Sequence, residues 1–206
     1  RPAERLVRSV VPDIAPDRLG RVVQLAGGNP YYLEELLRRV VERGTDGLPD
    51  TVLAVIASVI DRQEREARRI LRAASVFGET LWRGGVAALL GGHAGDVDVA
   101  AWLDALSDRE VLTRTGGTRF AGEVEYRFRH GLLREAAYAT LTDADRTTAH
   151  RLAAEWLERA GEPDALVVAE HFEHGGEPAR AIPWLLKAAI AAYDGHAWQA
   201  ARALVE

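Results

Sequence analysis

Two short stretches hold the residues whose types and spacing suit chemistry best. Residues 27–30 read Gly-Gly-Asn-Pro, and residues 126–130 read Tyr-Arg-Phe-Arg-His, an alternating strand that ends in a histidine. Pro30 offers a rigid apolar face, and Gly28 has no side chain to block the approach of a flat ring. His130 can donate a hydrogen bond to a phosphate. Both stretches also have plainer interpretations, because Asn29 and Pro30 make a good helix start and His130 could be a core or capping residue.

The sequence contains no phosphate-binding loop. Such a loop needs Gly-Lys-Ser/Thr, because its lysine must reach the β- and γ-phosphates of the nucleotide. The chain has one lysine, Lys187, which lies between Leu186 and Ala188. No Ser/His/Asp arrangement and no Gly-x-Ser-x-Gly elbow is present. We therefore expect no catalytic residues and no enzyme activity in this chain alone.

Metal and redox chemistry have little support. The chain has no cysteine, which excludes disulfides and thiolate metal sites. His171 and His174, with the neighbouring Glu170 and Glu173, are more typical of a helix-end face than of a metal site, so we expect no metal. The pair Glu34-Glu35 is expected on a solvated helical surface.

Composition indicates a globular protein of 206 residues with a net charge of −5, which gives no basic footprint for nucleic acid or an anionic membrane. No signal peptide or membrane span is visible, so we expect a cytoplasmic protein with no membrane partner. The absence of methionine indicates a fragment of a longer chain, and 25 arginines against one lysine suggest a bacterial source.

Hydrophobic periodicity predicts a mainly α fold. One helix, residues 31–43, carries Leu33, Leu36, Leu37, Val40 and Val41 on one face. Beyond a linker, further helices are expected at 51–61, 64–76, 81–90, 97–107, 131–141 and 143–160. Strands at 111–113 and 123–129 would form a two-stranded ribbon, with Tyr126 and Phe128 on one face. We predict a helical lid subdomain (1–46), a winged-helix domain (47–142) and a TPR-like region of helical hairpins (143–206).

The last region has the spacing of a tetratricopeptide repeat. The matching positions are Trp184, Lys187, Ala188, Ala191, Ala200 and Leu204. An alanine-rich helical hairpin could match these positions by chance. If the repeat is real, residues 164–206 present a surface for a protein partner and favour self-association, because stacked repeats bury their apolar faces against one another.

The order of lid, winged helix and repeats resembles the regulatory half of the STAND class of AAA+-related ATPases. The strings that carry the resemblance are residues 27–38, 48–56 and 126–138, with His150 and Ala153-Ala154 in the following helix. It covers roughly residues 1–160. Val59 and Gln63 depart from the family pattern, where arginine and leucine are expected, which bears on the detailed domain contacts.

The resemblance implies particular roles. In relatives, the Gly-x-Pro of the lid packs against adenine and a winged-helix histidine touches the β-phosphate of ADP. It thus implies that Gly28, Asn29, Pro30 and His130 bind nucleotide in a longer parent. It also implies ATP or ADP with Mg²⁺ as cofactors there, a P-loop ATPase domain before this chain, and an attached kinase, cyclase or LuxR-type DNA-binding effector.

Three functions remain in competition. The first is a regulatory part of a STAND-type ATPase that couples nucleotide state to partner binding or effector output. The second is a winged-helix DNA-binding regulator, whose recognition helix at 98–107 would carry Asp98 and Asp104 and no basic residue. Phosphates would repel that helix, so DNA binding is not expected. The third is a pure helical-repeat scaffold.

Overall fold

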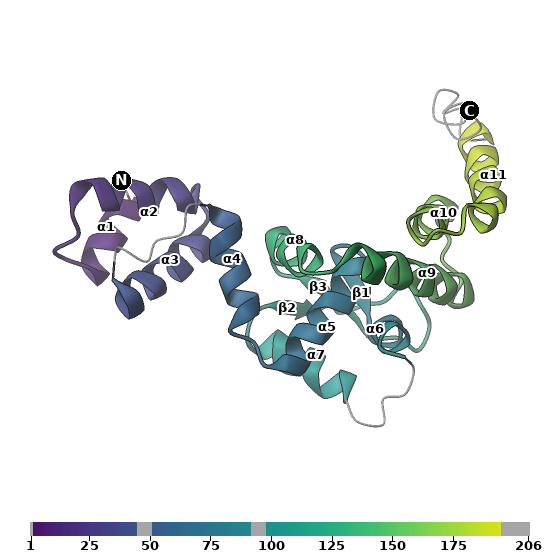
Figure 1. The fold of residues 1–206 in the computed structure, drawn as a ribbon, viewed down its shortest axis with the longest axis horizontal. Coiled ribbons are helices and arrows are strands. Elements are labelled where there is room, and N and C mark those ends of the chain that lie inside the picture. The colour runs from purple at the N-terminus through teal and green to yellow at the C-terminus, as the bar shows by residue number, and fades with distance from the viewer. Residues whose placement is uncertain (1, 45–50, 92–97, 195–206) are drawn as a thin grey trace. The chain divides into compact units, whose positions relative to one another are not determined.

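The computed structural model describes residues 2–44, 51–91 and 98–194. Across these residues the chain forms eleven helices and three short strands, so the fold is mainly helical with one small antiparallel sheet (Figure 1). It divides into two compact units, residues 1–63 and 64–206. No helix in the described part of the chain is long and apolar enough to cross a membrane.

The first unit consists of α1 (Pro2–Val10), α2 (Pro16–Ala26), α3 (Pro30–Arg43) and α4 (Val52–Asp61). Helices α2 and α3 both begin on a proline, which has the backbone angle that a helix start requires and lacks only an N–H that would be unbonded there. Helix α2 ends at Gly27, whose φ of 55° is left-handed. The sequence had grouped α4 with the domain that follows, whereas it lies in the first unit.

Apolar side chains from α1, α2 and α3 form the core of the first unit. Leu33, Leu36, Leu37 and Val40 of α3 are buried in it, as their spacing predicts. Val41 was expected on the same face and is 64% exposed, because it lies at the edge of the apolar stripe.

The acidic pair of α3 is not uniformly solvated. Glu34 is exposed, but Glu35 is only 5% exposed and forms an ion pair with Arg62, which follows α4. Arg38 Nη1 lies 3.3 Å from the same carboxylate. The expectation that Glu35 is solvated was therefore wrong, and the reason is a partner from outside its own helix.

The second unit begins with α5 (Arg65–Val76), β1 (Thr80–Trp82), α6 (Arg83–Leu89) and α7 (Val99–Asp108). Strands β2 (Leu112–Arg114) and β3 (Glu125–Phe128) follow, and then α8 (Gly131–Ala139). The sheet has the order β1-β3-β2, with both pairs antiparallel. It lies among α5, α7 and α8 (Figure 1).

Strand β1 was missing from the sequence prediction, which placed a helix over 81–90 and only two strands. Thr80, Leu81 and Trp82 pair instead with Arg127, Tyr126 and Glu125 of β3. β-Branched and aromatic side chains favour this extended conformation. The alternation in β3 is confirmed: Tyr126 and Phe128 are buried and Arg127 is exposed.

Three further helices complete the unit: α9 (Asp143–Ala160), α10 (Ala165–His174) and α11 (Pro178–Asp194). Helix α9 begins at the capping residue Thr142 and packs on α5, α6 and α10, and α10 packs in turn on α11. On α11, Ala181 and Ala189 are buried. Ala200 and Leu204, which the repeat pattern uses, lie outside the described residues.

Candidate functional site

The predicted lid residues line a concave surface of the first unit. Its volume is about 840 Å³, and Gly28, Asn29 and Pro30 form one wall at the start of α3. The other walls come from α1 and α2. The lining residues are Pro2, Ala3, Glu4, Leu6, Gly20, Val23, Gln24, Ala26, Gly27, Gly28, Asn29, Pro30 and Leu33. We call this surface the lid groove.

The turn that forms this wall is open because of its glycines. Gly27 and Gly28 have φ angles of 55° and 80°, and no atom lies within 4 Å of where a Cβ would stand on either residue. The Asn29 side chain is occupied, because its Oδ1 accepts the backbone N–H of Tyr31 at 3.0 Å. Asn29 is thus confirmed as the helix cap, and it faces the groove as part of a fixed turn.

The charge of the lid groove limits what it can hold. Among its lining residues there is no arginine or lysine, and the one ionisable group is the carboxyl of Glu4. A phosphate would meet no basic side chain among the described residues that line the groove. The apolar walls and the amide side chains of Gln24 and Asn29 suit an uncharged, flat, partly polar group.

His130 belongs to the second unit, whereas the lid groove belongs to the first. It is the residue before α8, and its extended backbone lets its carbonyl accept the N–H of Leu133 at 2.9 Å. The ring is half-buried. Burial, and then the neighbouring Arg129, lower the pKa of His130 below its usual 6.5. The imidazole is therefore neutral at pH 7.

A buried histidine pair joins α9 and α10. The sequence analysis did not predict this pair. His150 Nδ1 lies 3.0 Å from His171 Nδ1, and His150 Nε2 lies 2.9 Å from the hydroxyl of Tyr138. His171 was expected, together with His174, on a face at the end of a helix. His174 is exposed, but His171 is only 7% exposed, because its side of α10 packs on α9.

The pair is neutral at physiological pH. Burial is the main cause that lowers the pKa of His150 to about 4, and His174 and Arg146 lower it further. Burial also lowers the pKa of His171 to about 3, with smaller contributions from His150 and His174. No group of three or more His, Cys, Asp or Glu residues among those described has a metal-binding arrangement. The pair forms a hydrogen-bonded contact between α9 and α10.

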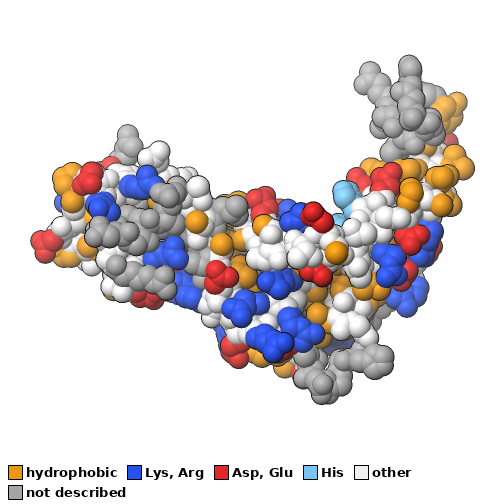
Figure 2. Space-filling view, viewed as in Figure 1, with side chains coloured by type: hydrophobic (Ala, Val, Ile, Leu, Met, Phe, Trp, Pro, Cys, Tyr) orange, Lys and Arg blue, Asp and Glu red, His pale blue; other side chains and the backbone are white. Residues whose placement is uncertain are grey.

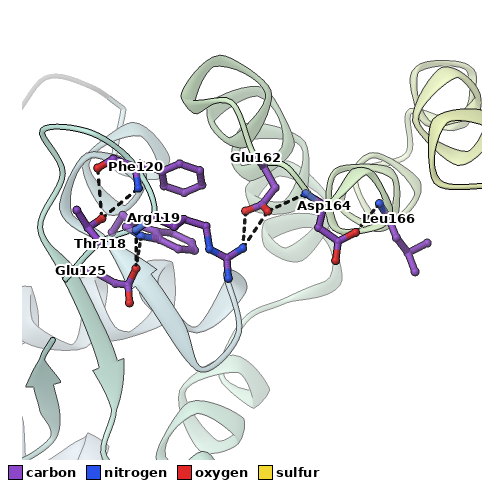
Figure 3. A network of polar contacts seen from close by, with 8 residues as sticks. Thr118, Arg119, Phe120, Glu125, Glu162, Asp164 and Leu166 are labelled. Atoms are coloured by element: carbon purple, nitrogen blue, oxygen red, sulfur yellow. Dashed lines mark hydrogen bonds and ion pairs between the residues drawn. The ribbon is translucent and has the colours of Figure 1, made fainter. Parts of the chain in front are cut away.

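A second polar cluster joins the β2–β3 loop to the turn between α9 and α10 (Figure 3). Glu162, whose side chain is fully buried, accepts hydrogen bonds from Arg119. Glu125 in β3 accepts from the indole N–H of Trp82 at 3.0 Å. The sequence did not predict this cluster. Glu162 follows Gly161, a position at which an exposed polar turn residue is common.

Comparison of the chain with known protein families, with curated proteins and with solved structures found no match.

Proposed function

We propose that this chain is a non-catalytic regulatory part of a STAND-type signalling ATPase. It would couple the ADP or ATP state of a P-loop domain to partner binding or to the output of an attached effector, in the cytoplasm. The observation that carries the proposal is the lid groove, an apolar concavity whose wall is the Gly28-Asn29-Pro30 turn.

The composition of the groove supports a divided nucleotide site. Adenine is flat and uncharged, and the apolar walls with a few amide groups suit it. The triphosphate needs cations and backbone donors, and the described residues that line this groove include no arginine or lysine. If the base is held here and its phosphates and Mg²⁺ lie on a separate P-loop domain, both the apolar walls and the lack of basic lining residues are explained.

The order of elements supports a winged helix in the second unit. The order α5-β1-α6-α7-β2-β3, with a sheet ordered β1-β3-β2, contains the helices and the β-ribbon that such a domain requires. We assign the domain to these elements and α8, and TPR-like hairpins to α9–α11.

His130 would connect this domain to ADP. It stands at the N-terminus of α8, where backbone N–H groups favour an anion. A β-phosphate there would raise the pKa of the imidazole and oppose the effects of burial and Arg129. Bound ADP would then hold the domain against the ATPase core in an inactive state.

The DNA-binding alternative has less support, because the groups that would face DNA are engaged within the unit. Asp104 of α7 accepts a hydrogen bond from the Tyr126 hydroxyl at 2.7 Å and lies 3.9 Å from Arg114. Arg119 in the loop between β2 and β3 is bound to Glu162. The acidic helix packs on the sheet, and the loop arginine already has a carboxylate partner.

A protein partner is better supported at α11. Ile182, Leu186, Ile190 and Tyr193 are each more than half exposed and recur along one stripe of the helix. Figure 2 shows hydrophobic side chains gathered over this helix. An exposed apolar stripe of this kind suits a protein contact, including self-association. The same stripe would also suit a pure scaffold, so nucleotide binding at the lid groove is what distinguishes the regulatory function from the scaffold.

The test is an NMR titration of the isotope-labelled chain with ADP. We expect weak, millimolar binding that shifts the amide signals of Gly28, Asn29 and Leu33. Gly28→Ala should abolish these shifts. Gly44→Ala is the matched control, because Gly44 has a similar φ of 73° against 80° but lies at the far end of α3.

Three further outcomes separate the functions. Groove signals that stay unmoved by ADP, or that Gly28→Ala and Gly44→Ala change equally, would refute the base-binding role and favour the scaffold. Sequence-dependent, submicromolar binding of duplex DNA, measured by fluorescence anisotropy, would favour the transcriptional regulator. ATP turnover by the purified chain above an empty-vector preparation would contradict a non-catalytic role.

A further inference from the structure

A charged contact joins the β2–β3 loop to the turn between α9 and α10. Arg119 Nη1 donates to both carboxylate oxygens of Glu162, at 2.9 and 2.8 Å (Figure 3). The Glu162 side chain is 0% exposed and the Arg119 side chain 47% exposed. The same carboxylate accepts the backbone N–H of Asp164 at 3.0 Å. Glu162 therefore binds both a loop of the sheet and the residue that caps α10.

The loop side of this contact is fixed in an aromatic cluster. The ring of Phe120 lies 4.8 Å from that of Trp82 in β1 and 5.3 Å from that of Trp156 in α9. The Arg119 guanidinium lies over the Trp82 ring at 5.5 Å. The backbone N–H of Arg119 also donates to the Glu125 carboxylate at 3.3 Å. The loop cannot shift without disturbing these contacts.

The helix side is equally constrained. Glu162 N–H donates to the carbonyl of Leu157 at 3.0 Å, which closes the C-terminus of α9. Asp164 Oδ1 accepts the N–H of Leu166 at 3.0 Å, which caps α10. Movement of α10 away from α9 would therefore displace the Glu162 carboxylate.

A buried carboxylate is stable only while its partner is present, because an unpaired buried charge is far more costly than a paired one. If the α9–α10 turn moves, Arg119 loses the group that holds it. If the loop moves, Glu162 must reach water, which requires the turn to open. Intermediate positions leave one charge uncompensated.

We propose that the Arg119–Glu162 pair is a latch that couples the docking of α10 and α11 to the order of the β2–β3 loop. A partner that binds α11 and displaces the α9–α10 turn releases the loop. By the reciprocity of coupling, a partner that captures the loop loosens the turn. The latch uses neither the lid groove nor a nucleotide, so it stands apart from the proposed function.

Hydrogen–deuterium exchange of the whole chain tests the latch. Arg119→Gln removes the loop side, and Glu162→Gln removes the charge but keeps an acceptor for Asp164. We expect Arg119→Gln to speed exchange at Asp164 and Leu166, and Glu162→Gln to speed exchange at Phe120, each by about tenfold or more. For each variant, exchange is thus measured in the segment that does not carry the substitution.

The control is Glu110→Gln, which breaks the exposed Arg129–Glu110 ion pair of 3.2 Å just beyond the ends of β2 and β3. It should leave both segments unchanged. Arg119→Lys should restore most of the protection, because it keeps a cation beside Glu162. Faster exchange confined to the segment that carries the substitution, a uniform rise that includes α5, or the same effect from Glu110→Gln would each overturn the latch. If Glu162→Gln does not fold, exchange at Leu166 in Arg119→Gln and Arg119→Lys tests the latch alone.

Discussion

The buried histidine pair should make the second unit sensitive to mild acid. His150 Nδ1 and His171 Nδ1 are 3.0 Å apart, so only one hydrogen fits between them. Protonation of both rings would set two N–H groups against each other. Arg146, whose guanidinium lies over the Tyr138 ring, and the exposed His174 add positive charge beside the pair.

The sign of the effect follows from the direction of the shifts. In the unfolded chain each histidine gains a proton near its usual pKa of 6.5, whereas in the folded chain the pKa is about 4 for His150 and about 3 for His171. Between these values the unfolded state binds more protons than the folded state. The free energy of unfolding therefore falls as the pH drops below 6.5, and the pair has no pH-dependent effect well above 6.5.

The magnitude follows from about 1.4 kcal/mol per pKa unit. At about pH 5, each histidine should lower the free energy of unfolding by about 2 kcal/mol, and the pair by about 4 kcal/mol. That loss is a large part of the stability of a typical domain, about 5–15 kcal/mol. Most carboxylates stay ionised at this pH, because their usual pKa values are about 4.

Urea unfolding followed by tryptophan fluorescence, at several pH values from about 7.5 to about 5, measures this loss. All five tryptophans lie beyond residue 63, so the signal reports the second unit. His171→Gln should remove at least half of the pH dependence. His174→Gln should remove a smaller part of it, because His174 lowers the pKa values of the pair less than burial does. Equal pH dependence in wild type and His171→Gln would refute the argument.

Two further substitutions test the helix junctions. Asn29→Ala should cost the first unit about 1 kcal/mol, because Tyr31 N–H loses its capping acceptor; urea unfolding followed by circular dichroism measures it, and an unchanged midpoint would contradict the capping role. Gly175→Ala should cost the second unit about 1–3 kcal/mol, because the added Cβ would stand 2.7 Å from the backbone nitrogen of Arg151 and force α9 and α10 apart. Gly116→Ala, which meets no atom within 4 Å, is its control, and equal stability of the two variants would refute the close-packing argument.

Local patterns predicted the individual elements well. The helix expected over residues 143–160 has those bounds, because a capping threonine precedes it and a glycine follows it. The strand expected before His130 is present with its buried and exposed faces as predicted. Such features depend on residues close together in the chain, so they can be predicted from the sequence.

What the sequence did not predict depends on partners distant in the chain. Strand β1 is three residues long and is a strand only because β3 pairs with it. Glu35, His171 and Glu162 are buried because another helix or loop covers them, and helical spacing gives a face without naming what covers it. The Gly28-Asn29-Pro30 turn was identified, but the walls of its groove come from α1 and α2. The winged-helix and repeat assignments, the nucleotide roles and His130 as a phosphate ligand stay predictions.

The buried ionisable groups lie at junctions between elements. Glu35 meets Arg62, which follows α4; His150 of α9 meets His171 of α10; and Glu162 meets Arg119 of the β2–β3 loop. Each contact crosses from one element to another. The two ion pairs add little net stability, but removal of one partner from either leaves a buried charge unpaired and is strongly destabilising. A junction built on such an ion pair resists partial opening, because an intermediate position leaves a buried charge uncompensated. Two discrete states at such junctions would suit the regulatory role proposed above.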